Sequence, residues 1–314
     1  MAVANIGVAI HEKTSAGMLA AITHAEQAGV PAVWLTTGAG PDALTVFAAA
    51  STVTSRVRMG TAVVPTYPRH PLVVAQQAAD IAALAPGRFT LGLGPSHKPS
   101  MEIRYGIPYV RPLGHLREFV GVVKRLLTGE HVKHTGERFR VDARLFQGAQ
   151  VPVIVSALRS GSFRLAGELA DGAVTWLCPP AYLRSVALPA MAEGAAKAGR
   201  ARPRLIAHAY LALTTDAAAL EQGLGEALAH YPTMFNYQEM FANAGFPEAR
   251  AGKWSQGMRD AVLLHGTEAV CRDKVRAFLE TSGAEELVLS VMATGADRGA
   301  SLRRSLDWVG ALQF

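Results

Sequence analysis

The sequence predicts a closed (β/α)8 barrel, and three observations support this prediction. Eight short apolar runs recur along the 314 residues, amphipathic segments lie between them, and 50% of the chain is hydrophobic. Short apolar runs that alternate with amphipathic helices are typical of parallel βα units, and eight units favour a closed barrel over an open sheet. Since no Gly/Ser/Pro-rich linker divides the chain, we expect a single barrel domain over residues 1–314.

The apolar runs give the expected strands in chain order. They span residues 6–10, 32–36, 58–64, 89–94, 153–157, 173–177, 205–213 and 286–292. The third run is followed by Pro65, Pro68 and Pro71, and proline blocks continuation of a sheet. The chain must therefore turn sharply at this strand end.

Amphipathic segments with apolar residues three and four positions apart give the expected helices. They span residues 16–28, 43–54, 72–84, 113–127, 162–170, 181–198, 217–229 and 267–282. Asp42 and Asp216 stand at N-cap positions, where a carboxylate accepts hydrogen bonds from free backbone N–H groups. Glycines stand where helices should end, at Gly29, Gly129, Gly199 and Gly283.

Two segments depart from the repeat. Residues 131–146 are expected to form a hairpin before the fifth strand, and residues 230–258 form a long excursion rich in Tyr, Phe, Met and Trp. Long irregular loops inside compact domains are usually lids or interfaces. We expect the 230–258 excursion to help select a small-molecule substrate, whose identity no motif reveals.

Composition limits the classes of partner. The net charge of +6 comes from scattered basic residues without an aromatic-rich basic stripe, so we expect no nucleic-acid binding but a preference for anionic small molecules. No uncharged run approaches the roughly 20 residues that span a membrane, and the start lacks a signal-peptide pattern. Cys178 and Cys271 form no C-x-x-C motif, which favours a reducing compartment. We expect a soluble cytoplasmic protein.

Barrels of this kind carry their chemistry at the C-terminal ends of the strands. This rule selects the positions that follow the first six strands: His11 and Glu12, Thr36 and Thr37, residues 63–67, residues 94–98, residues 156–161, and residues 176–178. Metal and hydrolytic chemistry are not expected, because H-E-x-x-H and G-x-S-x-G are absent and His131-x-x-His134 falls in the hairpin. Cys178 is expected at most to line the pocket.

The end of the third strand carries the most informative motif. Residues 60–72 read G-T-A-V-V-P-T-Y-P-R-H-P-L, followed by A-Q-Q-A at 75–78 and G-R-F-T-L-G-L-G at 87–94. Taken alone, the G-T-A-V-V-P part favours an ordinary buried strand that ends in a proline turn. The whole passage resembles the third βα unit of the bacterial luciferase-like family of flavin and deazaflavin oxidoreductases. The resemblance implies a luciferase-like barrel with a non-prolyl cis bond at Ala62–Val63, placed against a cofactor ring.

A second motif follows the fifth strand. Small residues at 160–162 precede a helix, so free backbone N–H groups lie beside Arg159 and could bind a phosphate, although Ser-Gly is also an ordinary cap. The run L-A-G-E-L-A-D-G at 165–172 is similar to the family's phosphate loop, whereas Arg159-Ser160 stands where the family usually has glycine and proline.

A third motif, G-L-G-P-S-H at 92–97, is not a dinucleotide fingerprint because the second pair of glycines is missing. Its glycines favour the close approach of a ring, and Ser96 and His97 could hydrogen-bond the ring edge or supply a proton. His97 could equally be a structural histidine.

The resemblance extends over nearly the whole chain and includes N-I-G-V-A at 5–9, A-E-Q-A-G at 25–29 and Y-V-R-P at 109–112. Within the family, the sequence is similar to the branch that uses coenzyme F420, and this resemblance implies hydride transfer to or from a deazaflavin. Relatives that oxidise alcohols have an acidic residue and a histidine where this chain has Thr36-Thr37, so we expect reduction of an activated C=C or C=N bond. The resemblance also implies a homodimer.

Two alternatives stay open. One is an FMN-dependent two-component monooxygenase of the same fold, supplied by a separate reductase that regenerates the reduced cofactor. The other is a non-catalytic flavin- or deazaflavin-binding barrel. For a reduction, the expected proton donors are His97 and Tyr67, whereas a non-catalytic barrel would have a pocket without a proton donor. No metal is expected. The expected cofactor-binding residues are Thr36, Ala62, Val63, Pro65, Gly94, Ser96, His97, Ser156, Ala157, Leu158, Arg159, Ser160 and Gly161.

Overall fold

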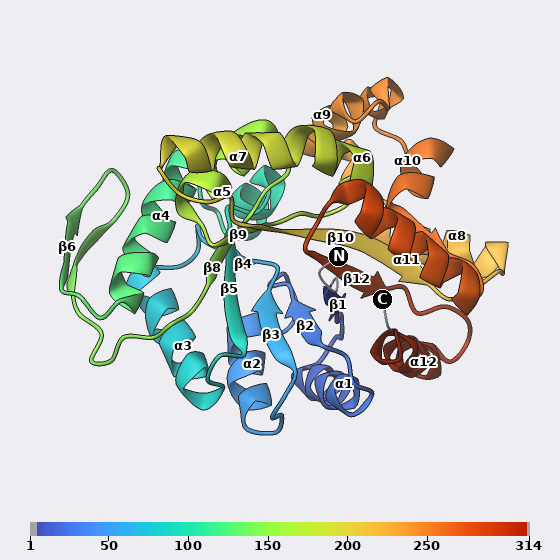
Figure 1. Ribbon diagram of the computed structural model, residues 1–314, viewed down its shortest axis with the longest axis horizontal. Helices are drawn as coiled ribbons and strands as arrows, with labels where there is room; N and C mark the ends of the chain where they lie inside the picture. Colours follow the sequence, from blue (N-terminus) through green and yellow to red (C-terminus); the bar gives the residue numbers. More distant parts are fainter. Residues whose placement is uncertain (1–4, 313–314) are drawn as a thin grey trace.

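The structure, a computed structural model that describes residues 5–312, contains the expected closed barrel (Figure 1). In the described residues eight parallel strands form the barrel: β1 Asn5–Ala9, β2 Ala32–Leu35, β3 Arg58–Thr61, β5 Phe89–Gly94, β8 Val153–Ser156, β9 Gly172–Val174, β10 Arg204–Ala212 and β12 Glu286–Val291. The barrel closes because β10 pairs with β9 on one side and β12 on the other, and β12 pairs with β1. The (β/α)8 prediction is confirmed.

Helices surround the strands: α1 Ser15–Gln27, α2 Ala43–Ser51, α3 Pro71–Leu84, α4 Pro112–Leu127, α5 Ser160–Leu169, α6 Pro180–Tyr182, η2 Leu183–Ala187, α7 Leu188–Lys197, α8 Ala217–Leu228, α11 Glu268–Ser282 and α12 Arg298–Gly310. The predicted helix over 181–198 is divided by the π-helical turn η2. Asp42 and Asp216 cap α2 and α8 as predicted. Helix α12 was not predicted; along it the buried Leu306, Trp308 and Val309 are interleaved with exposed charged residues, Arg303, Arg304 and Asp307.

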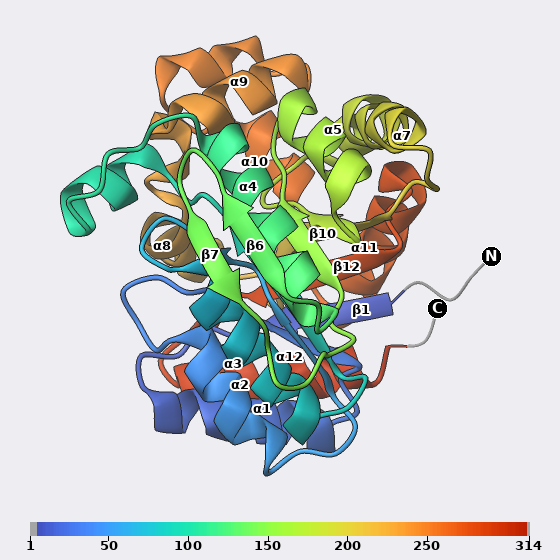
Figure 2. The same cartoon turned by 90° about the vertical axis from the view of Figure 1, so that its left-hand side faces the viewer.

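The expected hairpin is confirmed. Strands β6 Val132–Thr135 and β7 Arg140–Ala143 pair antiparallel and lie over α4 in Figure 2. Glu118 of α4 fixes the turn, because its carboxylate accepts backbone N–H bonds from Arg138 and Phe139 at 2.9–3.2 Å.

The prediction of an irregular excursion over 230–258 was wrong. The segment contains η3 Tyr231–Thr233, α9 Phe235–Asn243, η4 Pro247–Ala251 and α10 Gln256–Val262, followed by β11 Leu263–His265, which pairs with β10. The aromatic residues recur at helical spacing and pack together. Tyr237, Met240 and Phe241 are buried on α9, and the rings of Phe241 and Trp254 lie 5.4 Å apart.

A polar layer fills the N-terminal end of the barrel. Glu286, 1% exposed, accepts a hydrogen bond from the Trp34 indole at 3.0 Å and contacts the guanidinium groups of Arg58 and Arg204 at 3.4 and 3.6 Å. The Trp34 ring occupies space next to Gly60, where a Cβ would lie 2.4 Å from the ring. Since this end is closed by packed side chains, a ligand site belongs at the opposite end.

The third strand of the barrel is followed by a short additional strand. This strand, β4 Val64–Pro65, is separated from β3 by two residues and pairs with the end of β5. The predicted strand over 58–64 is therefore interrupted at Ala62 and Val63. This interruption lies at the C-terminal end of the barrel, where the cavity opens.

Candidate active site

A cavity of about 1260 Å³ lies at the C-terminal ends of the barrel strands. Most of the residues predicted to bind a cofactor line it: Thr36, Ala62, Val63, Pro65, Ser96, His97, Ser156, Ala157, Leu158, Arg159, Ser160 and Gly161. Gly94 and Tyr67 are not among the lining residues. The fold thus brings the three sequence motifs to one surface, as the position rule for barrels predicted.

The peptide bond between Ala62 and Val63 is cis, as the resemblance implied. Neighbouring strands hold both sides of this bond. The Ala62 N–H donates to the Leu35 carbonyl at 2.7 Å, and the Val63 carbonyl accepts from the Thr37 N–H at 3.3 Å. The Val63 side chain therefore has a fixed position in the cavity wall.

Gly94 lies behind this wall instead of lining it. A Cβ on Gly94 would stand 2.4 Å from Ser156 Oγ and 2.6 Å from Val63 Cγ2, well inside contact distance. The missing side chain lets Val63 and Ser156 approach each other across the strand. Gly94 consequently shapes the cavity without contacting its contents.

The N-terminus of α5 forms a second part of the cavity. Ser162 holds the turn, because its hydroxyl accepts from the Leu158 and Arg159 N–H groups at 3.0 and 3.1 Å and donates to the Arg159 carbonyl at 2.7 Å. The first helical residues, Ser160 and Gly161, present backbone N–H groups to the cavity end of the helix, where the dipole favours an anion. Arg159 also lines this end, and its guanidinium lies 5.7 Å from the Phe235 ring.

Charged side chains make the cavity electropositive. Among the described lining residues there are four cations, Lys13, Arg104, Arg159 and Arg298, and two carboxylates, Glu12 and Glu226. Glu226 and Arg298 neutralise each other in a bidentate pair at 2.6 and 2.8 Å, which leaves three cations against one carboxylate among the described lining residues. The balance favours a ligand with a negatively charged tail.

The loop after β5 presents Ser96 and His97 to the cavity. Ser96 has a left-handed backbone (φ 61°), and its carbonyl accepts from the Tyr109 hydroxyl at 2.9 Å. Burial, followed by the nearby His230, lowers the pKa of His97. Near neutral pH the ring is therefore mostly uncharged. His97 can then donate a hydrogen bond or relay a proton, but only a small fraction of the molecules carries a protonated ring at position 97.

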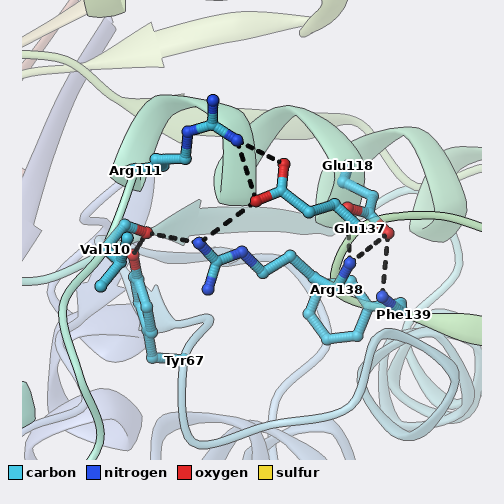
Figure 3. Close-up of polar contacts among 7 residues, drawn as sticks. All are labelled: Tyr67, Val110, Arg111, Glu118, Glu137, Arg138 and Phe139. Carbon is cyan, nitrogen blue, oxygen red and sulfur yellow. Dashed lines mark hydrogen bonds and ion pairs between the residues drawn. The ribbon is translucent and has the colours of Figure 1, made fainter.

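Tyr67, predicted as a proton donor, is occupied elsewhere. Its hydroxyl donates to the Val110 carbonyl at 2.7 Å, a bond shared with Arg138 of the hairpin at 3.0 Å (Figure 3). Its ring stacks on His115 at 3.9 Å and on Tyr109 at 5.1 Å. Tyr67 and Arg138 thus both bond the segment before α4, and because the Tyr67 hydroxyl is occupied there, we do not retain it as a candidate proton donor.

The hairpin contact continues at the start of α4. The guanidinium of Arg111 donates to both carboxylate oxygens of Glu137 at 3.0 Å, so the turn of the hairpin is tied to this segment through both Glu137 and Arg138 (Figure 3). Because Tyr109 of the same segment bonds the Ser96 carbonyl, the hairpin braces the loop that carries His97.

A buried polar chain at the cavity floor was only partly foreseen. His208 Nε2 lies 2.8 Å from Ser290 Oγ, and Ser290 Oγ lies 3.2 Å from His11 Nε2. Trp176, a lining residue, stacks on the His208 ring at 3.5 Å. The sequence predicted His11 as a site residue because it follows the first strand, but His208 and Ser290 were not predicted. Each of them is a polar residue inside an otherwise apolar stretch of a strand, and this pattern could have indicated a buried polar contact.

The 230–258 segment supplies aromatic side chains to the cavity. Tyr231, Asn236 and Tyr237 line it together with Tyr210 of β10. Burial raises the pKa of Tyr231 to about 12 and that of Tyr237 well above its usual value, so both phenols stay neutral. They form an uncharged part of the cavity wall.

A metal site and a membrane-spanning helix are absent from residues 5–312. No group of three His, Cys, Asp or Glu side chains there could hold a metal ion. Cys178 is completely buried and does not line the cavity, contrary to expectation. None of the helices between residues 5 and 312 combines the length and the apolar character needed to cross a bilayer.

Relatives with curated functions match parts of the chain. An F420-dependent glucose-6-phosphate dehydrogenase from Beutenbergia cavernae is 37% identical over 203 residues, 58% of this chain and 59% of that protein. A 5,10-methylenetetrahydromethanopterin reductase from Methanolobus tindarius is 25% identical over 308 residues, 91% of this chain and 92% of that protein. The match thus spans less than two thirds of the Beutenbergia enzyme but nearly all of the reductase.

Solved structures share the fold. An F420-dependent secondary alcohol dehydrogenase in complex with an F420-acetone adduct superposes with a TM-score of 0.83 at 20% identity and covers 97% of both chains. A coenzyme F420-dependent tetrahydromethanopterin reductase from Methanopyrus kandleri gives 0.79 at 22% identity, with 99% of this chain and 98% of that chain covered. The family model described as luciferase-like monooxygenase matches residues 2–286. The chain therefore belongs to the luciferase-like monooxygenase family.

Proposed function

We propose that this protein is a coenzyme F420-dependent oxidoreductase that transfers hydride between reduced deazaflavin and a small organic substrate. We further propose that it reduces an activated C=C or C=N bond. The observation that carries the proposal is the convergence, in one cavity, of the Val63 wall and the α5 N-terminus. The Val63 wall suits contact with a flat ring, and the α5 N-terminus suits an anionic tail of the same ligand.

The residues present fit such a cofactor. Val63, backed by the Cβ-free Gly94, offers a flat apolar contact, and the Ser160 and Gly161 N–H groups offer donors to a phosphate. The cationic lining compensates the charge of an anionic tail. When bound, a deazaflavin supplies hydride chemistry, and the protein has to bind it, orient the substrate and exclude water. His97 is the residue we propose to hold or relay the proton that a reduction consumes.

The names of the relatives support the choice of cofactor. Both curated relatives and two of the structural relatives carry F420 or a methanopterin-linked reductase activity in their names. A further structural relative, a type II Baeyer-Villiger monooxygenase from Pseudomonas putida, was solved with FMN, at TM-score 0.79 and 18% identity. We therefore keep the FMN-dependent monooxygenase as the competing outcome. The proposal also includes a homodimer and a separate reductase that regenerates the reduced cofactor.

The direct test is oxidation of reduced F420 by a panel of conjugated carbonyl compounds and imines under anaerobic conditions. We expect substrate-dependent oxidation with matching loss of the C=C or C=N bond. Oxygen uptake with reduced FMN would assign the protein to the monooxygenases instead. Tight F420 binding without oxidation by any compound would identify a non-catalytic binding barrel.

A further inference from the structure

The buried chain from His208 through Ser290 to His11 ends in the cavity and dictates a protonation pattern. We infer that it fixes His11 as the tautomer with its proton on Nδ1, and that this N–H donates to an uncharged carbonyl or imine group of the substrate. The substrate class rests on the proposed function. The tautomer follows from the hydrogen bonds alone.

The chain begins at His208, which is completely buried. The backbone N–H of Leu177 donates to His208 Nδ1 at 3.4 Å, so this nitrogen is an acceptor. Burial, followed by the nearby His11, lowers the pKa of His208 well below its usual value, and the ring is neutral. A neutral imidazole that accepts at Nδ1 carries its proton on Nε2. That proton is donated to Ser290 Oγ at 2.8 Å.

Ser290 links His208 to His11 through two hydrogen bonds of its hydroxyl. Its side chain is completely buried, and its oxygen already accepts from His208. Its own O–H then needs an acceptor, because a buried donor left unpaired is costly. Within residues 5–312, the remaining hydrogen-bond contact of Ser290 Oγ is His11 Nε2 at 3.2 Å. His11 Nε2 is therefore the acceptor, and the proton of the neutral ring lies on Nδ1.

His11 presents this N–H to the cavity. Its side chain is exposed there, and Nδ1 has no hydrogen-bond partner among the residues that the structure describes. Burial by the cavity walls lowers the pKa of His11 to about 4 even though the ring is open to the cavity, so the donor is uncharged near pH 7. The Trp176 ring meets His11 edge to face at 6.1 Å and stacks on His208, which limits rotation of both imidazoles.

An uncharged donor of fixed direction suits the reduction of a conjugated carbonyl compound. The substrate's β-carbon gains a C–H bond with the hydride that reduced deazaflavin gives up, and the C=C electron pair shifts toward the carbonyl oxygen. The substrate gains the two electrons that the reduced cofactor loses, and His97 relays a proton from solvent to the α-carbon, or to the nitrogen when the substrate is an imine. The His11 N–H bond stays intact. Its hydrogen bond strengthens as negative charge collects on the oxygen, or on nitrogen in an imine, which lowers the barrier.

The tautomer is tested without any ligand by ¹⁵N NMR of protein labelled at histidine. The signals of His11 and His208 are assigned from their loss in the variants H11N and H208Q. We expect protonated Nδ1 in His11 and protonated Nε2 in His208, both unchanged from pH 8 to pH 5.5. In S290A we expect His11 to populate both tautomers. Protonated Nε2 in His11 of the unsubstituted protein would overturn the inference.

The role toward the substrate is tested with a matched pair of variants, with reduced F420 and 2-cyclohexen-1-one as the probe. The amide of H11N can reach the place of Nδ1, whereas the amide of H11Q reaches that of Nε2 and keeps only the Ser290 contact. We expect kcat/KM to fall about 100-fold in H11Q, with H11N at least about tenfold above it. Equal losses in two folded variants, or no loss in H11Q, would overturn the substrate role. If the unsubstituted protein reduces no acceptor, the proposed function and substrate role fail together, while NMR still decides the tautomer.

Discussion

Adding one methyl group at Gly94 tests whether Val63 and Ser156 form the wall on which a cofactor rests. The new Cβ would lie 2.6 Å from Val63 Cγ2 and 2.4 Å from Ser156 Oγ, whereas ordinary van der Waals contact begins at 3.4 Å. The two pairs of atoms would therefore be too close by about 0.8 and 1.0 Å. Both side chains line the cavity and have to move outward into it. Overpacking of this kind costs about 1–3 kcal/mol. For a chain of this length, that lowers Tm by about 2–5 °C.

The expected functional effect is larger, because displacement of a binding surface by about 1 Å disrupts ligand placement. We expect the Kd for F420 to rise at least about tenfold in Gly94→Ala, measured by fluorescence titration together with Tm. Gly38→Ala is the control, since Gly38 also lines the cavity but a Cβ there meets nothing within 4 Å. If Gly94→Ala lowers Tm while both variants bind F420 normally, the cofactor does not rest on Val63 and Ser156.

Two further predictions concern stability. Glu286→Gln should lower the unfolding free energy by about 2–4 kcal/mol, because the buried carboxylate contacts Arg58 and Arg204. The control Glu268→Gln, which breaks an exposed pair, should lower it by less than about 1 kcal/mol. Equal losses in denaturant unfolding would contradict this prediction. Burial lowers the pKa of His115 to about 4, below the unfolded value of about 6.5, so its contribution is complete above pH 6.5 and is lost as pH falls toward 4. Stability should therefore fall between pH 6.5 and 5 and fall less in His115→Leu; parallel profiles would contradict this assignment.

The strand order and the location of the site were predictable from the sequence because local patterns decide them. Apolar runs and amphipathic helices set the barrel, and the rule that chemistry follows the strands led to His11, Thr36, His97 and the 156–161 segment. The cis bond at Ala62–Val63 came from the resemblance, since no residue pattern by itself distinguishes it from a proline turn.

The misses have physical causes too. Tyr67 follows a strand end, but stacking of its ring on His115 and Tyr109, which the sequence does not reveal, accompanies a hydrogen bond from its hydroxyl to the Val110 carbonyl. The 230–258 segment was predicted to be irregular because its helices, α9 and α10, are short and are separated by turns, so that no long helical period appears in the sequence. His208 and Ser290 lie on strands 82 residues apart, and only the barrel's closure between β10 and β12 brings them together.

Comparison of F420 and FMN binding, each oxidised and reduced, tests the central claim most directly. Anaerobic titrations of the purified protein would be followed by absorbance and fluorescence. We expect micromolar or tighter binding of F420, clearly stronger than that of FMN, because the cationic lining and the α5 N-terminus favour the more extended anionic tail. Stronger binding of reduced FMN, or binding of neither cofactor, would contradict the assignment of this cavity to a deazaflavin.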